Sequence, residues 1–506
     1  MDQNAALRRA LLADTMSQSL DLLRHGFAAT RVGMFEEAQI RFLQETRGRL
    51  RSDPRAWQIL GLAERGLQDS AAAHVAFLEA ARLAPADSLI AHSVARSALE
   101  AGYPAVILFD RARQLAPSDG SILLGRAAAQ IAEGRADKAR GNLAALLASN
   151  PRWIDGHLTL ARLAAAADPS GDCTFALADA LRQFPKQAEL WLALLRVLAE
   201  SQNYDGLIDA CQRAAVSLGD LPELTIFKAQ ALEETGRADV ALELLLQLPA
   251  RFAKQVRVPV LRCLIRLGRM EEASEIAERT SNEDRDIWPY RALIWRVMND
   301  ERWHALEGDH RLIGMYDLSA KIDLHALHIV LSRIHSVSTR MIDQSVRGGT
   351  QTDGNLLARA EPELRGLRSA LLKAVTDHVF QLPSVRPGHP TLLHEREPIR
   401  FAGAWSVRLT GGGYHVDHVH QQGWLSAVFY VSTPDESEGD SPGDLVFGGN
   451  RALLGTAGYF RKVSPRPGQL VIFPSTMWHG TRPFPEGERL TVAFDIAPPR
   501  GSFANA

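Results

Sequence analysis

The first 285 residues repeat a helical pattern of apolar and polar positions. Prolines interrupt this pattern at steps of 31, 32, 34 and 34 residues; they are Pro54, Pro85, Pro117, Pro151 and Pro185. A second marker, Gly-Arg-x-acidic-x-Ala, recurs as GRADKA (134–139), GRADVA (236–241) and GRMEEA (268–273), with GMFEEA (33–38) as a variant. Because proline lacks an N–H and clashes with the preceding helical turn, it predicts helix ends. A period near 34 residues therefore predicts stacked pairs of antiparallel helices.

The unit from Pro54 to Pro85 resembles a tetratricopeptide repeat position by position. The matching residues are Trp57, Leu60, Gly61, Ala73, Phe77 and Ala80. Small residues stand where paired helices approach closely, and the phenylalanine fills the gap between them. We count about seven to eight such units, of which several are looser matches. The resemblance implies an α-solenoid over residues 1–285, a class whose concave surface binds protein or peptide partners.

After residue 285 the pattern stops repeating and later changes period. Residues 286–399 are predicted to form a helical bridge, because IDLHALHIVLSRIHSVSTRMI and ELRGLRSALLKAVTDHVFQL space apolar residues at helical intervals. Between them, QSVRGGTQTDGN (344–355) is predicted to be a polar loop, either a plain connection or a segment folding over a pocket. Residues 400–506 contain short β-rich runs separated by Gly, Pro and acidic turns, which predict a sandwich or barrel of antiparallel strands.

Composition excludes several classes of protein. The 506 residues are 46% hydrophobic and 23% charged, which is enough to bury full cores. The 57 Lys and Arg nearly balance the 59 Asp and Glu, so the chain lacks the electrostatic footprint of a nucleic-acid-binding protein. No apolar run approaches the ~18–20 residues of a membrane-spanning helix, and the N-terminal residues lack the unbroken apolar stretch of a signal peptide. We therefore expect a cytoplasmic protein without nucleic-acid or membrane partners.

Candidate metal chemistry is concentrated in the β-rich part. The segment GGGYHVDHVHQQGW places His415, His418 and His420 within six residues, with Asp417 among them. Because residues i and i+2 of a strand share a face, His418 and His420 can hold one ion from one side, and His415 and Asp417 form a competing pair of opposite parity. His479 follows some sixty residues later. Two ligands on one strand and a remote histidine can leave coordination positions open, as non-haem Fe(II) oxygenases require.

Residues from about 400 to 497 resemble the double-stranded β-helix (jelly-roll) domain of Fe(II)/2-oxoglutarate-dependent oxygenases. The resemblance is strongest to oxygenases that follow tetratricopeptide repeats in bacterial proteins. Its matching stretches are FAGAWSVRLTGGGYHVDHVHQQGWLSAVFYV, GDLVFG and PGQLVIFPSTMWHGTRPFPEGERLTVAFD, and the QSVRGGTQT segment fits the same group. The resemblance implies Fe(II), 2-oxoglutarate as cosubstrate, and O2.

The same resemblance implies roles for individual residues. His479 matches the distal iron ligand. Arg489, with Thr491 two residues later, matches the arginine-x-serine/threonine that binds the distal carboxylate of 2-oxoglutarate. A guanidinium fork suits that task because it can donate two parallel hydrogen bonds to a carboxylate. Tyr430 is placed like residues that add a hydroxyl hydrogen bond to the same carboxylate.

The first ligand pair departs from the family, which usually has His-x-Asp or His-x-Glu. This chain offers either His415 with Asp417 or His418 with His420. Because HVHxxGW is the core of the match, we favour His418 and His420 together with His479. A site of three histidines carries one negative charge fewer, which predicts weaker holding of Fe(II) and a more cationic ion.

A substrate pocket and a function complete the predictions. Trp424 and Trp478 flank the histidines, and Arg347 and Gln351 lie in the polar loop, so all four are predicted to line the pocket, with core packing as the alternative for the tryptophans. The predicted function is a dioxygenase that hydroxylates a protein or peptide recruited by the repeats. The alternative is a tetratricopeptide scaffold or adaptor whose β domain is catalytically silent.

Overall fold

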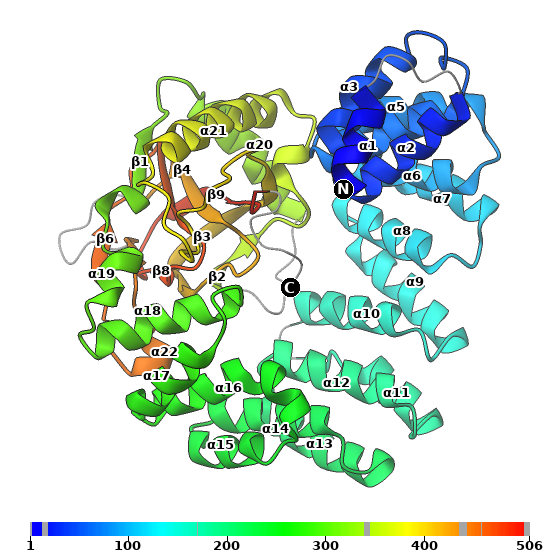
Figure 1. Cartoon of the computed structure of the whole chain (residues 1–506). Coiled ribbons are helices and arrows are strands. Elements are labelled where there is room, and N and C mark those ends of the chain that lie inside the picture. Colours follow the sequence, from blue (N-terminus) through cyan, green and yellow to red (C-terminus); the bar gives the residue numbers. More distant parts are fainter. Residues whose placement is uncertain are drawn as a thin grey trace. The chain divides into compact units, whose positions relative to one another are not determined.

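The computed structural model describes residues 3–12, 19–168, 171–337, 345–434, 443–456 and 458–499. Helices make up most of the first 300 residues, and seven of the nine described strands lie between residues 401 and 496 (Figure 1). The chain divides into two compact units, one of residues 1–142 with 353–369 and one of residues 143–352 with 370–506. This division does not fall at residues 285 and 399, so the predicted domain limits remain predictions about the sequence pattern.

Successive helices contact one another through the first unit. They are α1 (Gln3–Leu12), α2 (Ser19–Arg31), α3 (Phe35–Glu45), α4 (Pro54–Gly66), α5 (Ser70–Leu83), α6 (Ser88–Glu100), α7 (Val106–Leu115), α8 (Gly120–Ala132) and the first half of α9 (Ala136–Ser149), with the 3-10 turn Leu356–Ala358. The small residue of the repeat pattern is required here, since a Cβ on Gly61 of α4 would lie 2.7 Å from the Phe77 ring of α5. Gly26 faces Phe42, and Gly125 faces Phe109, in the same way.

The prolines mark helix ends, with one exception. Helix α5 ends two residues before Pro85, and α7 ends two residues before Pro117. Pro54 instead opens α4, where its missing N–H is not needed. The aspartates Asp53, Asp69, Asp87 and Asp119 cap the starts of α4, α5, α6 and α8 by accepting hydrogen bonds from backbone N–H groups. Each proline therefore signals a helix boundary, and the neighbouring residues decide which end it marks.

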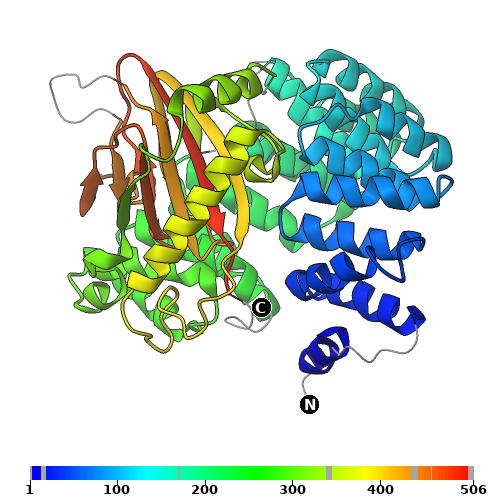
Figure 2. The ribbon, with the colours of Figure 1, turned by 90° about the horizontal axis from the view of Figure 1, so that it is seen from above.

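Further helices precede and cover a sheet in the second unit. They are α10 (Ile154–Ala167), α11 (Phe175–Gln183), α12 (Ala188–Glu200), α13 (Tyr204–Leu218), α14 (Pro222–Glu234), α15 (Ala238–Leu246), α16 (Ala253–Arg266), α17 (Met270–Arg279), α18 (Trp288–Val297), α19 (Arg302–Glu307), α20 (Leu324–Val337), α21 (Pro362–Gln381, of which residues after 369 belong here) and α22 (Arg451–Leu454). Short 3-10 turns lie at Ala250–Phe252, Arg285–Ile287 and His310–Leu312. Helix α20 packs on the sheet, and α21 runs along it (Figure 2). No helix among the described residues is long and apolar enough to cross a membrane.

The sheet is antiparallel throughout its described strand pairs. Its strands are β1 (Gly314–Asp317), β2 (Val346–Gln351), β3 (Phe401–His418), β4 (Leu425–Ser432), β5 (Leu445–Phe447), β6 (Arg461–Val463), β7 (Gln469–Pro474), β8 (His479–Thr481) and β9 (Glu488–Ile496). Their order is β1-β7-β4-β9-β3-β8-β5-β6, and β2 pairs with β3.

Strand β3 joins the two halves of this sheet. Its residues 401–410 pair with β9, whereas His415 and His418 pair with β8. The bend between these halves falls at three consecutive glycines, and Gly412 has φ +80°, a conformation that glycine adopts without strain. One half contains β1, β7, β4, β9 and the start of β3; the other contains the end of β3, β8, β5 and β6. This is the double-stranded β-helix predicted from the sequence, following helical repeats.

Two strands come from the part of the chain that we expected to be a helical bridge with a loop. Residues 346–351, inside the predicted loop 344–355, form β2 against β3, with Val346 opposite His415 and Gln351 opposite Val407. Gln344 lies outside the described residues. Residues 314–317 form β1 against β7. The prediction of a loop was wrong because β2 is polar and glycine-rich, so that pairing with β3, rather than apolar alternation, makes it a strand.

The later helical repeats and the sheet share one hydrophobic core inside the second unit. Trp478 and Leu453 are buried in the same cluster as residues of α14 to α18. The Trp478 indole N–H donates to the Pro289 carbonyl at 2.9 Å, and its ring meets Tyr290 edge-on. The Arg296 guanidinium of α18 donates to the carbonyls of Gly448 and Gly458. These helices therefore support the strands that carry the histidines.

Candidate active site

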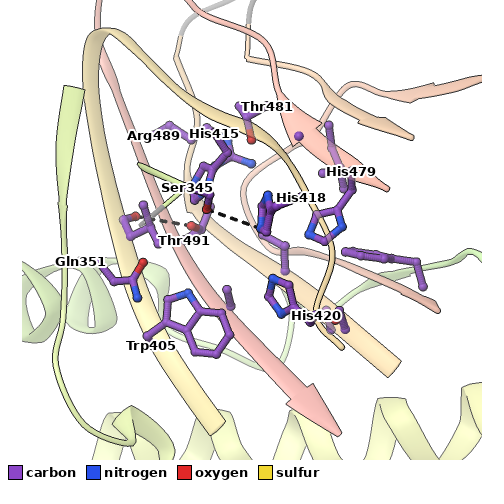
Figure 3. Close-up of a pocket in the computed structure, with 18 residues that line it drawn as sticks. Ser345, Gln351, Trp405, His415, His418, His420, His479, Thr481, Arg489 and Thr491 are labelled. Atoms are coloured by element: carbon purple, nitrogen blue, oxygen red, sulfur yellow. Dashed lines mark hydrogen bonds between the residues drawn. The ribbon is translucent and has the colours of Figure 1, made fainter. Parts of the chain in front are cut away.

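A cavity of about 190 Å³ opens inside the β-helix. Its walls come from β2, β3, β4, β5, β7, β8 and β9 (Figure 3). Its polar lining consists of Ser345, Gln351, His415, His418, His420, Ser426, His479, Thr481, Arg489 and Thr491. Its larger apolar lining residues are Trp405, Val407, Val428, Leu445 and Phe473. The cavity therefore contains most of the residues that the sequence singled out.

Three histidines converge at one end of this cavity (Figure 3). One ligand atom from each of His418, His420 and His479 lies within 4.8 Å of those of the others. His418 and His479 are register partners on β3 and β8. His420 lies just beyond β3, where its backbone N–H donates to the Ser475 carbonyl at 2.9 Å. Strand pairing and one tight turn thus bring together residues sixty positions apart.

Hydrogen bonds orient all three imidazole rings. Nδ1 of His418 donates to the Val416 carbonyl at 2.8 Å, and Nδ1 of His479 donates to the Met477 carbonyl at 3.0 Å. Nδ1 of His420 lies 2.8 Å from both carboxylate oxygens of Asp495. Because these partners accept and cannot donate, each Nδ1 carries the proton and each Nε2 keeps a lone pair. That is the tautomer with which a histidine binds a metal through Nε2.

Burial keeps His415, His418 and His479 neutral. It lowers the pKa of His418 to about 3, with repulsion from His420 adding to the effect. Burial likewise lowers the pKa of His479 and of His415 well below the ordinary value, and neighbouring histidines again add to the shift. Neutral imidazole is the form that can act as a ligand.

The competing pair, His415 and Asp417, does not converge with His479. A bulge between His415 and His418 sets two residues of β3 against one of β8, so His415 lines the cavity despite its odd spacing from His418. Its Nδ1 lies 3.1 Å from the Ser345 hydroxyl. Asp417 instead accepts hydrogen bonds from the Arg451 backbone N–H at 2.9 Å and from the Tyr459 hydroxyl at 3.3 Å. Strand alternation therefore does not predict the direction of His415. The carboxylate of Asp417 accepts a hydrogen bond from the first residue of α22.

Arg489 lies in the same cavity as a buried cation. Only 2% of its surface is exposed, and its Nη2 donates to the Tyr430 hydroxyl at 3.2 Å. Its Nε is buried with no hydrogen-bond partner among the described residues. Thr491 is buried beside it, with its hydroxyl 3.4 Å from the Val407 carbonyl. A buried guanidinium without a carboxylate is suited to bind an anionic ligand.

Strand β9 connects the two ends of the cavity. Arg489, Thr491 and Ala493 occupy alternate positions and all line the cavity. Asp495, the next residue in the series, contacts His420. Six residues of extended strand span ~20 Å, so one strand bears the arginine at one end and the histidine's carboxylate partner at the other.

The residues predicted to line a substrate pocket separate into two groups. Gln351 lines the cavity, and Arg347 lies on the same strand β2 but outside the lining. Trp424 is buried, and its indole N–H donates to the Thr391 carbonyl at 2.9 Å, so this ring, like Trp478, packs in the core outside the cavity. Core packing, the alternative for both tryptophans, therefore describes them.

Sequence reasoning missed Ser345, Trp405, Ser426 and Asp495. The Trp405 ring lies 5.5 Å from the His420 ring, between centroids. Asp495 could have been found by continuing the alternation of Arg489 and Thr491 along the strand. Ser345 has no comparable signal, because pairing of β2 with β3 brings it to the histidines.

Comparisons with known proteins found one matching family and several similar structures. Residues 403–495 match the family described as "Putative 2OG-Fe(II) oxygenase". A Pseudomonas putida prolyl-4-hydroxylase is similar at 18% identity over 38% of this chain and 94% of that chain, with a TM-score of 0.26. HygX from Streptomyces hygroscopicus, solved with nickel and 2-oxoglutarate bound, is similar at 16% identity over 38% and 85%, with a TM-score of 0.27.

A tetratricopeptide repeat protein from Parabacteroides merdae is similar at 12% identity over 48% of this chain and 98% of that chain, with a TM-score of 0.30. No curated protein sequence matches the chain. Fe(II) and 2-oxoglutarate, the predicted cofactors, are those of the matched family. Residues 403–495, which contain His418, His420, His479 and Arg489, are thus similar to the 2OG-Fe(II) oxygenases.

Proposed function

We propose that this protein is an Fe(II)- and 2-oxoglutarate-dependent hydroxylase. The observation that carries the proposal is the pairing of two incomplete sites in one cavity. Ligand atoms of His418, His420 and His479 lie within 4.8 Å of one another, and Arg489 is buried in the same cavity with no carboxylate partner among the described residues. Imidazole ligands suit Fe(II), and a buried guanidinium suits a dicarboxylate cosubstrate.

The residues divide the work along the cavity. His418, His420 and His479 would hold the metal, which supplies the activation of dioxygen when bound. Arg489 would bind the distal carboxylate of 2-oxoglutarate by two hydrogen bonds, with Tyr430 adding its hydroxyl and Thr491 a further one. Val428, Leu445 and Phe473 line the cavity with apolar surface, which excludes water and strengthens these charged contacts.

We also propose that the substrate is a protein or peptide that presents one side chain. The cavity of about 190 Å³ is smaller than the ~300–1,000 Å³ of pockets that enclose whole small molecules, and 2-oxoglutarate would occupy much of it. Gln351 and Trp405 line its wall near the histidines (Figure 3) and are candidates to contact the substrate. The helical repeats favour a protein partner, because such arrays present extended binding surfaces.

An anaerobic titration tests the oxygenase proposal. The purified protein would receive Fe(II) and then 2-oxoglutarate, and the visible metal-to-ligand charge-transfer band of the chelate would be recorded. We expect a band that is absent in His479→Ala. His157→Asn, which alters a buried histidine of α10 far along the chain, is the matched control and should keep the band. A folded wild-type protein that takes up no metal would refute the proposal and leave the scaffold alternative.

A second experiment tests the substrate class. Proteins captured by the wild-type chain and by His479→Ala would be compared by mass spectrometry after supply of Fe(II), 2-oxoglutarate and O2. We expect added oxygen on a captured protein only with the wild-type chain. Cosubstrate turnover without oxidation of any captured protein would contradict a protein substrate.

A further inference from the structure

We propose that Asp495 supplies the negative charge that a ligand set of three neutral histidines lacks, by accepting the Nδ1 proton of His420. Asp495 would then act as a positioning residue for the metal. This inference rests on the proposed function, since it concerns the same site.

The geometry ties the Asp495 carboxylate to His420 by several contacts. Both carboxylate oxygens lie 2.8 Å from His420 Nδ1. The Ser426 hydroxyl donates to one of these oxygens at 2.6 Å and lies 2.9 Å from the Ser475 hydroxyl. The side chains of His420 and Asp495 are only 16% and 14% exposed. Ser426 faces Asp495 in the register of β4 and β9, so strand pairing itself fixes the carboxylate.

The three histidines differ in the charge of their partners. Backbone carbonyls, which are neutral, accept from His418 and His479. A carboxylate accepts from His420, and a hydrogen bond to an ionised acceptor is stronger than one to a neutral acceptor. Such a partner fixes the ring and makes Nε2 a more basic metal ligand. His420 is therefore the ligand through which this chain can tune the metal.

This arrangement compensates for the missing carboxylate in the first ligand pair, where the chain has His418 and His420 instead of the usual His-x-Asp or His-x-Glu. In the usual His-x-Asp pair, the second residue brings a carboxylate directly to the metal. His420 occupies that second position here, and Asp495 places a carboxylate one hydrogen bond farther out. The site then keeps its negative charge, and the weaker holding of Fe(II) expected from three histidines alone is offset.

The test makes the same substitution at two aspartates, one inside and one outside the proposed site. Asp495→Asn removes the charge and keeps the shape; we expect its dissociation constant for Fe(II) to rise about 10- to 100-fold. We also expect the charge-transfer band to shift to shorter wavelength, because a less basic His420 leaves the iron less electron-rich. Asp209→Asn makes the same substitution at an exposed aspartate of α13 that does not line the cavity, so its dissociation constant and band should stay near those of the wild type. Thermal unfolding of the metal-free proteins checks that each variant is folded.

A rescue experiment separates charge from shape. His420→Asp puts a second carboxylate beside Asp495, and repulsion should weaken Fe(II) binding; adding Asp495→Asn should restore binding toward the wild-type value. Asp495→Ser replaces Asp495→Asn if the latter does not fold. A metal-binding wild type with unchanged affinity and band in the Asp495 variants overturns this inference alone, whereas a wild type without metal overturns the proposed function as well.

Discussion

Arginines of the helical repeats pair with carboxylates, whereas the buried Arg489 of the β-helix has no carboxylate partner among the described residues. On α14, Glu233 is 3% exposed and accepts hydrogen bonds from Arg262, at 2.9 and 3.0 Å, and from Arg266. Glu234 accepts from the same two arginines. These carboxylates raise the pKa of Arg262, against the effect of burial. Every charge of this Arg–Glu cluster is therefore matched by a charge from the chain itself.

The β-helix leaves its buried arginine without a carboxylate partner in the described structure. Arg489 is as buried as Glu233, yet it donates its hydrogen bond to the hydroxyl of Tyr430 and lies over the ring of the same residue. Arginine does not lose its proton in proteins, and an unpaired buried charge costs several kcal/mol. The residue that bears this unfavourable energy lines the cavity. The difference separates a cluster that stabilises the fold from a cation that is available to a ligand.

The largest effect should come from Arg489→Gln. We expect the dissociation constant for 2-oxoglutarate to rise about 100- to 1,000-fold, or ~3–4 kcal/mol, because the distal carboxylate loses its charged partner. The melting temperature of the ligand-free protein should stay the same or rise, since an uncompensated cation is removed. Anaerobic titration with 2-oxoglutarate and thermal unfolding measure the two quantities. A destabilised variant with unchanged affinity would make Arg489 structural, like Arg262.

Glu233→Gln should have the converse effect. We expect the free energy of unfolding to fall by ~3 kcal/mol, because two arginines lose the carboxylate that they share. Affinity for 2-oxoglutarate should change less than about twofold, because no member of the Arg–Glu cluster lines the cavity. Denaturant unfolding gives the first value, and Glu272→Gln, which breaks an exposed pair with Arg269, is the control that should leave stability nearly unchanged. Lost cosubstrate affinity would show that the cluster also supports the cavity.

His378 is a buried base that, unlike arginine, can lose its proton and stay neutral. Burial lowers the pKa of His378, on α21, to about 4, and its ring lies 3.0 Å from the Tyr316 hydroxyl. Between pH 6.5 and 4 the unfolded chain binds this proton more readily, so stability is fully present above pH 6.5 and is lost as the pH falls toward 4. His378→Phe should remove ~2–3 kcal/mol of that loss. Urea unfolding at pH 7 and pH 4.5 measures the free energy of unfolding of both proteins. An equal fall in this free energy for the wild type and for His378→Phe would contradict the role given to His378.

The sequence predicted the fold where a period was present. Spaced prolines and Gly61 with Phe77 indicated helix pairs, and short β-rich runs separated by turns indicated antiparallel strands. Strand β2 could not be predicted, because VRGGTQ has no apolar alternation and becomes a strand only by pairing with β3. The bend of β3 at its three glycines likewise follows from sheet closure rather than from local preference.

The site was predictable where a motif names residues and unpredictable where packing decides. His479 and Arg489 stand in a recognisable stretch, and the structure places both in the cavity. His415 lines it as well, because a β-bulge overrides the alternation that had put it on the other face. Trp424 flanks the histidines in sequence but turns into the core, where the Thr391 carbonyl satisfies its N–H. The contact of Asp495 with His420 and Ser426 could be recognised only once the register of β4 with β9 was known.

Tyr430→Phe should have the smallest effect on the affinity for 2-oxoglutarate, and it tests the contrast between Arg489 and the Arg–Glu cluster directly. Burial raises the pKa of Tyr430, so its hydroxyl stays protonated and can donate to a carboxylate while it accepts from Arg489. Loss of one hydrogen bond should raise the dissociation constant for 2-oxoglutarate about 3- to 10-fold, or ~1 kcal/mol. Tyr459→Phe, which removes a hydroxyl bound to Asp417 outside the cavity, should change nothing. If Tyr430→Phe instead raised the dissociation constant as much as Arg489→Gln does, Tyr430, rather than a ligand, would be the partner that Arg489 requires. The contrast with the Arg–Glu cluster would then fail.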